Sequence, residues 1–310
     1  LARSLKQDNY FVLETQAQGF PQWTPYDGQL RLLAFSHLAS GADMVEYWHW
    51  HSLHNACETY WKGVLSHDFG ENRTYREAVA VGADFRRLGK HLIHLKKENK
   101  AAILVSNEAL TGLNWFPLGD GRDYNDVVRW IYDALYQMNV ECDFIFPEAE
   151  NLSDYKVIFM PALYCASEAL LRGLKDFVRE GGVLVGTFKS CFANENVKVY
   201  SDAQPHILQE CFGAAYDQFF TAEEMPLEVL LEKYSREDSE QTESARGFME
   251  CLRPQGARVL ARYSHSNWGQ YAAAVCNDFG RGAAYYLGCM CSSALLKRIL
   301  KSALDRAEIK

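Results

Sequence analysis

Short apolar runs alternate with helical segments through residues 101–186, and this alternation constrains the fold more than any other feature. Four runs of strand length are almost wholly apolar: 101–105, 142–146, 157–160 and 183–186. Between them, apolar residues recur at the spacing of an amphipathic helix, as at Val128, Ile131, Leu135 and Met138. Apolar strands that alternate with helices predict a parallel sheet with helices on both faces.

The remaining C-terminal sequence continues this α/β domain. Residues 258–263, 272–276 and 283–287 predict additional strands, and residues 292–304 predict a closing helix. Residues 232–243 are strongly charged and have little to bury, which predicts a mobile loop or a helix end.

A charged linker separates this part from the N-terminal part. Asn72 or Thr74 can cap a long helix that runs to about residue 95, and residues 96–100 then break its apolar pattern. A chain of 310 residues is long enough for two domains. We therefore expect one domain over residues 1–96 and another over residues 101–310.

Glu14 is the first candidate for chemistry. It ends the apolar run 10–13, and a polar loop containing Trp23 follows it. Barrel enzymes present their catalytic groups at the carboxyl ends of strands, so this position suits a glycosidase nucleophile beside an aromatic ring. The alternative is that Glu14 only caps a strand in a solvated loop.

A second strand ends in a similar loop. Residues 30–40 have helical spacing with Gly41 as a C-terminal stop, and residues 44–47 are a further apolar run. The following loop is rich in Trp, His and Glu, including Glu58 and Trp61. The order predicts one βα unit and the start of another, with both strand ends at the same mouth.

These motifs resemble a known family. LETQ with Trp23, the strand GADMVEYWHWHS and the loop ETYWKGVLSHD resemble the end of the catalytic barrel of β-galactosidases of glycoside hydrolase family 42. Residues from 101 onward resemble the trimerisation domain of that family. The resemblance covers essentially the whole chain.

The resemblance implies a fold: the last βα units of a TIM barrel, then a flavodoxin-like domain related to class I glutamine amidotransferases. It implies a retaining β-galactosidase that acts as a homotrimer on terminal β-galactosides. Glu14 would be the catalytic nucleophile, Trp23 would line the galactose site and Glu58 would bind sugar hydroxyls.

Two positions depart from the family pattern. Trp61 stands where many members have a histidine, although its ring can still form an aromatic wall of the site. His49 and His51 stand where many have arginine. His51 and His67 are weaker site candidates, because a histidine near a site mouth is more often a surface residue.

The acid/base glutamate of the family precedes the nucleophile and follows an asparagine at an earlier strand end. Asn107-Glu108 has the right dipeptide but comes after the nucleophile, so we interpret Glu108 as a loop carboxylate. We expect the chain to be a fragment that lacks about six of the eight βα units of a barrel, and to be inactive alone.

Composition excludes several classes of function. The net charge of −8 gives no electrostatic support for nucleic-acid binding. No apolar run approaches the roughly 20 residues that span a membrane. The nine cysteines lack metal-site spacing, which favours buried thiols in a reducing cytoplasm. We expect no metal and no cofactor.

Two other functions remain as alternatives. Cys165 follows a predicted strand and His206 lies downstream, so one alternative is an amidotransferase-like cysteine hydrolase. However, no glycine flanks Cys165 as a sharp nucleophile turn requires, and Ser167 is better explained as a helix N-cap. The other alternative is a non-catalytic oligomerisation module.

Overall fold

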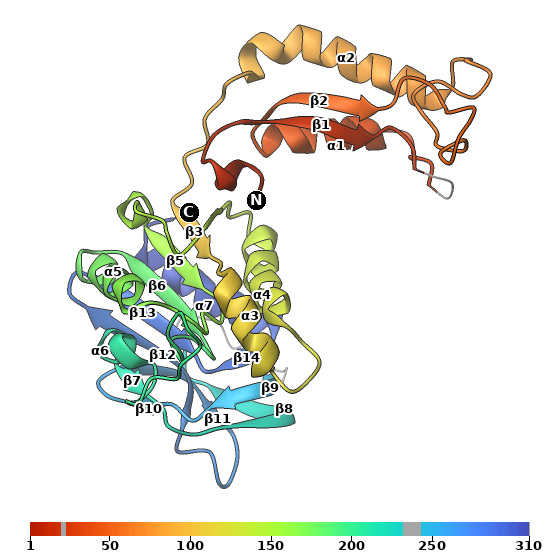
Figure 1. Ribbon diagram of the computed structural model, residues 1–310. Helices are drawn as coiled ribbons and strands as arrows, with labels where there is room; N and C mark the ends of the chain where they lie inside the picture. Colours follow the sequence, from red (N-terminus) through yellow and green to blue (C-terminus); the bar gives the residue numbers. More distant parts are fainter. Residues whose placement is uncertain (20–22, 232–242, 310) are drawn as a thin grey trace. The chain divides into compact units, whose positions relative to one another are not determined.

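The elements of the computed structural model form two separate units, Leu1–Glu98 and Asn99–Lys310 (Figure 1). The structure describes residues 1–19, 23–231 and 243–309. The charged segment expected to be a loop or helix end, residues 232–243, therefore lies almost entirely outside the described residues.

The first unit is a β-α-β-α arrangement. After a short 3-10 helix (Arg3–Leu5), it contains β1 (Tyr10–Gln16), α1 (Gln29–Ala39), β2 (Ala42–Trp48) and α2 (Arg73–Leu92). β1 and β2 pair in parallel, as expected from two successive βα units. The Asn72 side chain accepts a hydrogen bond from the Tyr75 amide at 3.0 Å and so caps α2.

The two helices of this unit pack against each other. The Phe35 and Phe85 rings meet edge to face at 5.6 Å, and Arg31 pairs with Asp84 at 2.7 Å. In contrast to this helix contact, two apolar side chains of β1 are not covered: Phe11 is 62% exposed and Leu13 is 67% exposed. β1 is therefore not the buried strand that its apolar sequence predicts, at least within this chain.

The second unit is built on a ten-stranded sheet of order β14-β9-β8-β11-β12-β13-β6-β5-β3-β4. Its strands are β3 (Ala101–Leu104), β4 (Asp143–Ile145), β5 (Val157–Met160), β6 (Val183–Thr187), β8 (Phe219–Val229), β9 (Ser244–Glu250), β11 (Arg258–Tyr263), β12 (Ala272–Phe279), β13 (Gly282–Leu287) and β14 (Cys289–Cys291). β7 (Ala214–Ala215) and β10 (Arg253–Pro254) form a separate antiparallel pair.

The sheet is mixed, so the prediction of a parallel-sheet domain was wrong for about half of it. The strands β4, β3, β5, β6 and β13 run parallel to one another. From β12 to β14 each adjoining pair is antiparallel. The tight turn Phe279–Gly282 explains the change, because so short a connection can join only antiparallel strands.

Helices cover both faces of the parallel half, as predicted. They are α3 (Asn107–Trp115), α4 (Tyr124–Gln137), α5 (Glu168–Arg179), the short α6 (Gln209–Phe212) and α7 (Ser293–Arg306), with 3-10 turns η2 (Leu152–Asp154) and η3 (His206–Leu208). Asp123, Ser167 and Ser292 cap α4, α5 and α7. Among the described residues, no helix has both the length and the hydropathy to cross a bilayer.

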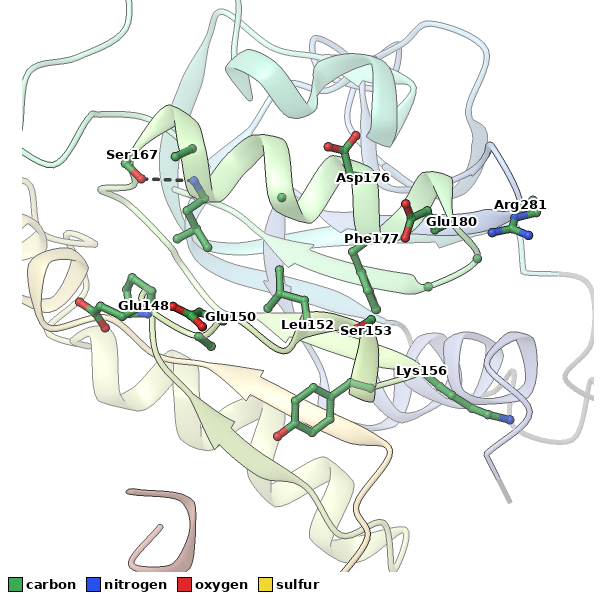
Figure 2. Close-up of a pocket in the computed structure, with 18 residues that line it drawn as sticks. Glu148, Glu150, Leu152, Ser153, Lys156, Ser167, Asp176, Phe177, Glu180 and Arg281 are labelled. Atoms are coloured by element: carbon green, nitrogen blue, oxygen red, sulfur yellow. Dashed lines mark hydrogen bonds between the residues drawn. The ribbon is translucent and has the colours of Figure 1, made fainter. Parts of the chain in front are cut away.

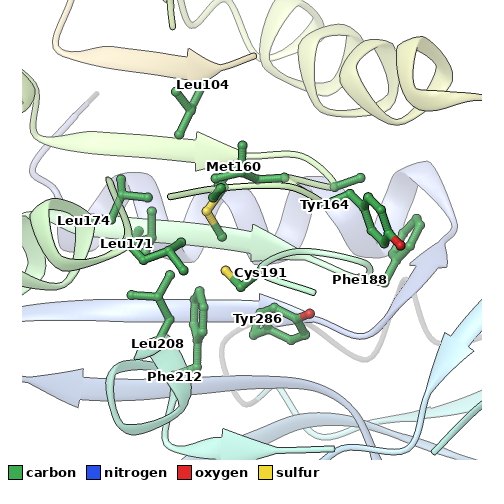
Figure 3. Packing of buried hydrophobic residues seen from close by; sticks show 14 of the residues in the cluster. Leu104, Met160, Tyr164, Leu171, Leu174, Phe188, Cys191, Leu208, Phe212 and Tyr286 are labelled. Atoms are coloured by element: carbon green, nitrogen blue, oxygen red, sulfur yellow. The ribbon is translucent and has the colours of Figure 1, made fainter. Parts of the chain in front are cut away.

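Successive residues of the strands pack alternately into two separate hydrophobic cores, one on each face of the sheet. On one face, Leu104 and Met160 pack with Leu171 and Leu174 of α5 and with Phe212 of α6 (Figure 3). On the other, the neighbouring strand residues pack with α4 and α7 through a set of large aliphatic side chains: Ile131, Leu135, Leu296, Ile299 and Leu300. This period-two division is what a strand buried on both faces requires.

One predicted loop is a helix. Asn107 and Glu108 form the first turn of α3, and Ser106 caps it by accepting a hydrogen bond from the Ala109 amide at 3.1 Å. Glu108 is therefore a first-turn helix carboxylate that also accepts a hydrogen bond from the Ser106 hydroxyl at 2.9 Å.

Candidate active site

Glu14 lies in an irregular part of β1. The sequence predicted that Glu14 is the last residue of its strand. This was wrong, because β1 continues two residues further to Gln16. Val12 pairs with Val45 and Thr15 pairs with Tyr47, so three steps along β1 match two steps along β2. This β-bulge contains Leu13 and Glu14, and bulges of this kind redirect side chains near functional sites.

The Glu14 carboxylate is exposed. Within residues 1–19, 23–231 and 243–309, no hydrogen bond or ion pair engages it. The chain beyond it is instead well anchored. The Ala17 backbone amide donates to Trp48 O at 3.2 Å, and the buried Gln18 side-chain Nε2 donates to Gly63 O at 2.9 Å. A fixed backbone therefore presents a carboxylate that is accessible from solvent.

Trp23 is held by the loop that follows β2. The Lys62 ammonium donates to Trp23 O at 2.7 Å and to the Thr24 hydroxyl at 2.9 Å. The Gly19 amide donates to the same carbonyl at 3.1 Å, and a Cβ at Gly19 would lie 2.8 Å from Trp23 Cβ. Neither Lys62 nor Gln18 was predicted as a site residue, although Lys62 adjoins Trp61 in the sequence.

Glu58 and Trp61 occupy one turn of the same loop. The Trp61 amide donates to Glu58 O at 2.8 Å, and Trp61 O accepts from the Leu53 amide at 3.0 Å. The Glu58 side chain is exposed and the Trp61 ring is half-buried. Lys62 thus links the turn that carries Glu58 and Trp61 to the segment that carries Trp23.

His49 belongs to the same cluster. The peptide bond between Trp48 and His49 is cis, and His49 O accepts from the Val64 amide at 2.7 Å. Burial lowers the pKa of His49 and nearby His51 lowers it further, whereas the Trp61 backbone and Glu58 raise it. Its Nε2 is buried and has no hydrogen-bond partner among the described residues.

The two weaker histidine candidates have structural contacts. The His51 ring lies 4.9 Å from the Phe69 ring, and the His54 ring stacks on the Phe69 ring at 4.9 Å. His67 Nε2 lies 3.0 Å from Thr59 O. These imidazoles order the loop, and His54, which was not predicted, takes part with them.

The structure therefore brings Trp23, Glu58 and Trp61 into one loop cluster, with His49 added. No hydrogen bond or ion pair in the described residues joins the Glu14 side chain directly to that cluster. The connection runs through the backbone, from Glu14 along the anchored segment to Gly19 and then to Trp23. No group of three His, Cys, Asp or Glu side chains suited to a metal occurs in the part of the chain that the structure describes.

The second unit does not support a cysteine nucleophile. Cys165 is 1% exposed, and burial, with Glu108 as a smaller cause, raises its pKa to about 11. A reactive cysteine needs the opposite shift. His206 is engaged elsewhere, since its Nδ1 contacts the Asp202 carboxylate at 2.7 Å and its ring stacks on Tyr200 at 3.7 Å.

The carboxyl ends of the parallel strands are filled rather than open. Ligands of doubly wound sheets bind in a crevice at this edge. Here the Lys189 ammonium lies 3.5 Å from the centre of the Phe116 ring and 4.5 Å from that of Phe248, and it donates to Pro117 O at 2.8 Å. A buried cation and aromatic rings thus occupy the place of a ligand.

One open groove lies near these strands. It has a volume of about 680 Å³ and lies between the β4–β5 connection and α5 (Figure 2). Glu148 and Glu150 are on one wall and Asp176 and Glu180 on the other, while the Ser167 hydroxyl is used in capping α5. The Ser167 hydroxyl is therefore not free to act as a nucleophile.

Comparisons with known proteins cover both units. The family model described as β-galactosidase matches residues 1–88, and the model described as the β-galactosidase trimerisation domain matches residues 99–310. Among curated relatives, β-galactosidase BgaP of Planococcus sp. (strain L4) is 27% identical over 318 aligned positions, covering 100% of this chain and 47% of that protein. β-Galactosidase BgaB of Geobacillus kaustophilus is 26% identical, covering 100% and 46%.

Solved structures agree with this similarity. The crystal structure of a β-galactosidase from Bacillus circulans sp. alkalophilus superposes with a TM-score of 0.91 at 25% identity, over 99% of this chain and 46% of that one. A β-galactosidase from Halorubrum lacusprofundi gives 0.85 at 25% identity, over 99% and 45%. The chain spans about half the length of the relatives it matches, and it belongs to the β-galactosidase family known as glycoside hydrolase family 42.

Proposed function

We propose that this chain is part of a retaining β-galactosidase that releases terminal β-D-galactose from β-galactosides. The observation that carries the proposal is the match of both units, in order, to the two β-galactosidase family models. The exposed carboxylate of Glu14 on an anchored strand supports the reaction chemistry.

In this mechanism Glu14 is the nucleophile. Its carboxylate attacks the anomeric carbon, the glycosidic bond breaks, and a covalent galactosyl-enzyme forms. A second carboxyl group, about 5–5.5 Å away, protonates the leaving oxygen and then activates the water that releases galactose. We propose that this acid/base residue lies in the part of the full-length protein that corresponds to the portion of the relatives outside the match.

The loop cluster would form the sugar-binding part of the site. The Trp23 and Trp61 rings would pack on the apolar faces of the sugar, and Glu58 would accept hydrogen bonds from its hydroxyls. Since His49 stands where many family members have arginine, it is the position at which substrate preference would differ.

We also propose the domain assignment expected from the resemblance. Residues 1–96 would be the last part of a TIM barrel, and the parallel pairing of β1 with β2 supports this. Residues 101–310 would be a flavodoxin-like trimerisation domain. The parallel strands support that assignment, because β4, β3, β5, β6 and β13 lie in the order second, first, third, fourth and fifth.

The assembly would be a homotrimer, as the trimerisation-domain match supports. Cytoplasmic localisation is proposed from the cysteines, since all nine are free thiols, as is usual in a reducing compartment. The alternative of a pure oligomerisation module draws on the second unit alone, which has two cores of its own.

The proposal is tested by Glu14→Gln in the full-length protein, with Glu46→Gln on the neighbouring strand as the matched control. We expect loss of at least about 1,000-fold in kcat on an aryl β-galactoside for Glu14→Gln, since the nucleophile is removed with little change of shape. Glu46→Gln should keep normal activity and both variants should keep the assembly.

A second arm identifies the nucleophile chemically. In Glu14→Ala, added azide should attack the anomeric carbon in place of the carboxylate while the aryl group leaves, and yield the α-galactosyl azide. Near-normal activity of Glu14→Gln, or an azide product of β configuration, would remove Glu14 from the nucleophile role.

A further inference from the structure

A small pocket lies at the start of β8 in the second unit, and no part of the proposed mechanism uses it. Its volume is about 320 Å³, and it is lined by Asp217, Gln218, Phe219, Phe220, Cys251 and Trp268. This is near the lower limit of the roughly 300–1,000 Å³ of small-molecule sites, which suits a ligand of one or two rings.

Aromatic rings form two walls of this pocket. The Phe220 ring stacks on the Trp268 ring at 5.0 Å with 17° between their planes. Phe219 packs on Phe248 at 5.1 Å, yet it is still 41% exposed. The exposed part of the Phe219 ring, which lies on the other face of β8 from the Phe220–Trp268 stack, favours a ligand with a flat apolar face.

Polar groups stand beside those rings. The Asp217 carboxylate pairs with the Arg253 guanidinium at 3.1 Å, and each side chain remains about half exposed. The Gln218 side chain is exposed, and its backbone is fixed because Gln218 O accepts from the Cys251 amide at 2.9 Å. The carboxylate and the side-chain amide, which both line the pocket, can serve neighbouring hydroxyl groups as acceptors and donors.

The loop that carries Trp268 is already ordered. The Gly269 amide donates to His265 O at 2.9 Å, and the Tyr271 amide donates to Trp268 O at 3.0 Å. The Asn267 amide donates to His265 Nδ1 at 3.1 Å, and the His265 ring stacks near Trp268 at 6.4 Å. A preformed wall lowers the entropic cost of binding.

We propose that this pocket binds a pyranose ring of a saccharide. A pyranose offers an apolar face to the aromatic walls and hydroxyls to Asp217 and Gln218, so it satisfies both halves of the site. A wholly apolar ligand would desolvate those polar groups without pairing them, which is unfavourable. The expected preference for galactose-ended saccharides rests on the proposed function, whereas pyranose binding itself does not.

The test is a titration of the full-length protein labelled with 5-fluorotryptophan, followed by 19F NMR. Trp268→Phe assigns the Trp268 resonance, and Trp115→Phe assigns that of Trp115, an indole on α3 that is 84% exposed and outside the pocket. Lactose, galactose and glucose are the probes, with glycerol as the control solute.

We expect lactose to shift the Trp268 resonance in a saturable way at millimolar concentration, and to leave that of Trp115 unchanged. Asp217→Asn and Phe219→Ala should each weaken this binding at least fivefold, and Asp217→Asn changes an exposed residue, so it tests the pocket even if Phe219→Ala fails to fold. A Trp268 resonance that no sugar moves at about 100 mM, well above the expected dissociation constant, overturns the proposal.

Two outcomes distinguish this proposal from a subunit contact at the same pocket and from the proposed function. If Phe219→Ala and Asp217→Asn dissociate the oligomer and no sugar shifts Trp268, the pocket is a subunit contact and the proposal is wrong. If Glu14→Gln keeps its activity while lactose still shifts Trp268, the proposed function fails and the saccharide pocket stands.

Discussion

The Glu250 carboxylate accepts a hydrogen bond from the backbone amide of Lys189 at 2.7 Å, although 61 residues separate them in the chain. Its other oxygen accepts from the Tyr286 hydroxyl at 2.9 Å. Glu250 and Lys189 are 0% and 1% exposed. These contacts tie the end of β9 to the loop after β6 and to β13, and so connect the antiparallel and parallel halves of the sheet.

Replacing Glu250 by alanine should lower the free energy of unfolding by about 2–5 kcal/mol. The change leaves the buried Lys189 amide and Tyr286 hydroxyl without their acceptor, and each unsatisfied group costs roughly 1–3 kcal/mol. Denaturant unfolding at pH 6, followed by circular dichroism, measures the loss. Glu250→Gln is the control and should change stability by less than about 1 kcal/mol, because it mimics the protonated acid.

The stability of the wild type should fall between about pH 5 and pH 8 relative to Glu250→Gln. Burial raises the pKa of Glu250 from 4.5 to about 8, against hydrogen bonds that lower it. The folded state therefore holds a proton that the unfolded state has lost, and this stabilisation is full below pH 4.5 and lost as pH rises through 8. The slope should reach about 1.4 kcal/mol per pH unit at most.

Lys189 makes the free energy of unfolding increase with pH, and it does so in a higher pH range than Glu250. Burial lowers its pKa from 10.5 to about 8, so its contribution to stability is full above pH 10.5 and is lost as pH falls through 8. Tyr216, Tyr263 and Tyr286, all close by, have pKa values raised well above 10 and stay neutral here. Together, Glu250 and Lys189 predict that the free energy of unfolding of the wild type has a minimum near pH 8. If the free energy of unfolding depended on pH in the same way in wild type and Glu250→Gln, this prediction would be contradicted.

Local features of this fold were predictable from the sequence. Asn72, Asp123 and Ser167 cap helices because an N-cap depends only on the next three residues. Helix α3 was missed, although Ser106 is a readable cap, because Gly112 and Asn114 weaken its helical pattern. The strand β8 was missed because Glu223, Glu224 and Pro226 interrupt its alternation.

Gly112→Ala should destabilise the second unit by about 1–3 kcal/mol. A Cβ at Gly112 would lie 2.7 Å from Cys165 Sγ and 2.8 Å from the Tyr164 ring, both buried, so the packing must shift. Thermal unfolding measures the effect. Gly82→Ala is the matched control in α2, where a Cβ meets nothing within 4 Å, and it should stabilise by up to about 1 kcal/mol. Equal effects of the two changes would refute the packing argument.

Alkylation of the native protein should modify Cys57 first and leave Cys165 intact. Cys57 is exposed, whereas Cys165 is buried with a pKa raised to about 11, so its thiolate is scarce at pH 7.5. Iodoacetamide treatment and peptide mass spectrometry give the order of reaction, and the unfolded protein serves as the reference in which both react. Selective early labelling of Cys165 in the native protein would revive the cysteine-hydrolase alternative.

The candidate site was predicted only in part. The motifs around Glu14, Trp23 and Glu58 are short and contiguous, so a resemblance could assign them. Lys62 and Gln18 act through contacts with Trp23 O and Gly63 O, which are 39 and 45 residues away in the sequence. No periodicity records such a pairing, and the folded loops are needed to show it. The bulge at Glu14 likewise depends on the register with β2.

Lys62 gives a test of that hidden part of the site. Lys62→Met removes the donor that holds Trp23 O and the Thr24 hydroxyl, and keeps most of the side-chain length. We expect KM for an aryl β-galactoside to rise at least about 10-fold in the full-length enzyme, since a hydrogen bond to a charged group is worth roughly 1.5–3 kcal/mol.

The turnover number separates positioning from chemistry. If Trp23 contacts the sugar equally in the ground state and the transition state, a looser Trp23 raises KM and leaves kcat within about twofold. Lys90→Met, an exposed lysine on α2, is the matched control and should change neither constant. A collapse of kcat in Lys62→Met would instead give Lys62 a part in the reaction itself, and an unchanged KM would show that its bond to Trp23 does not shape the sugar site.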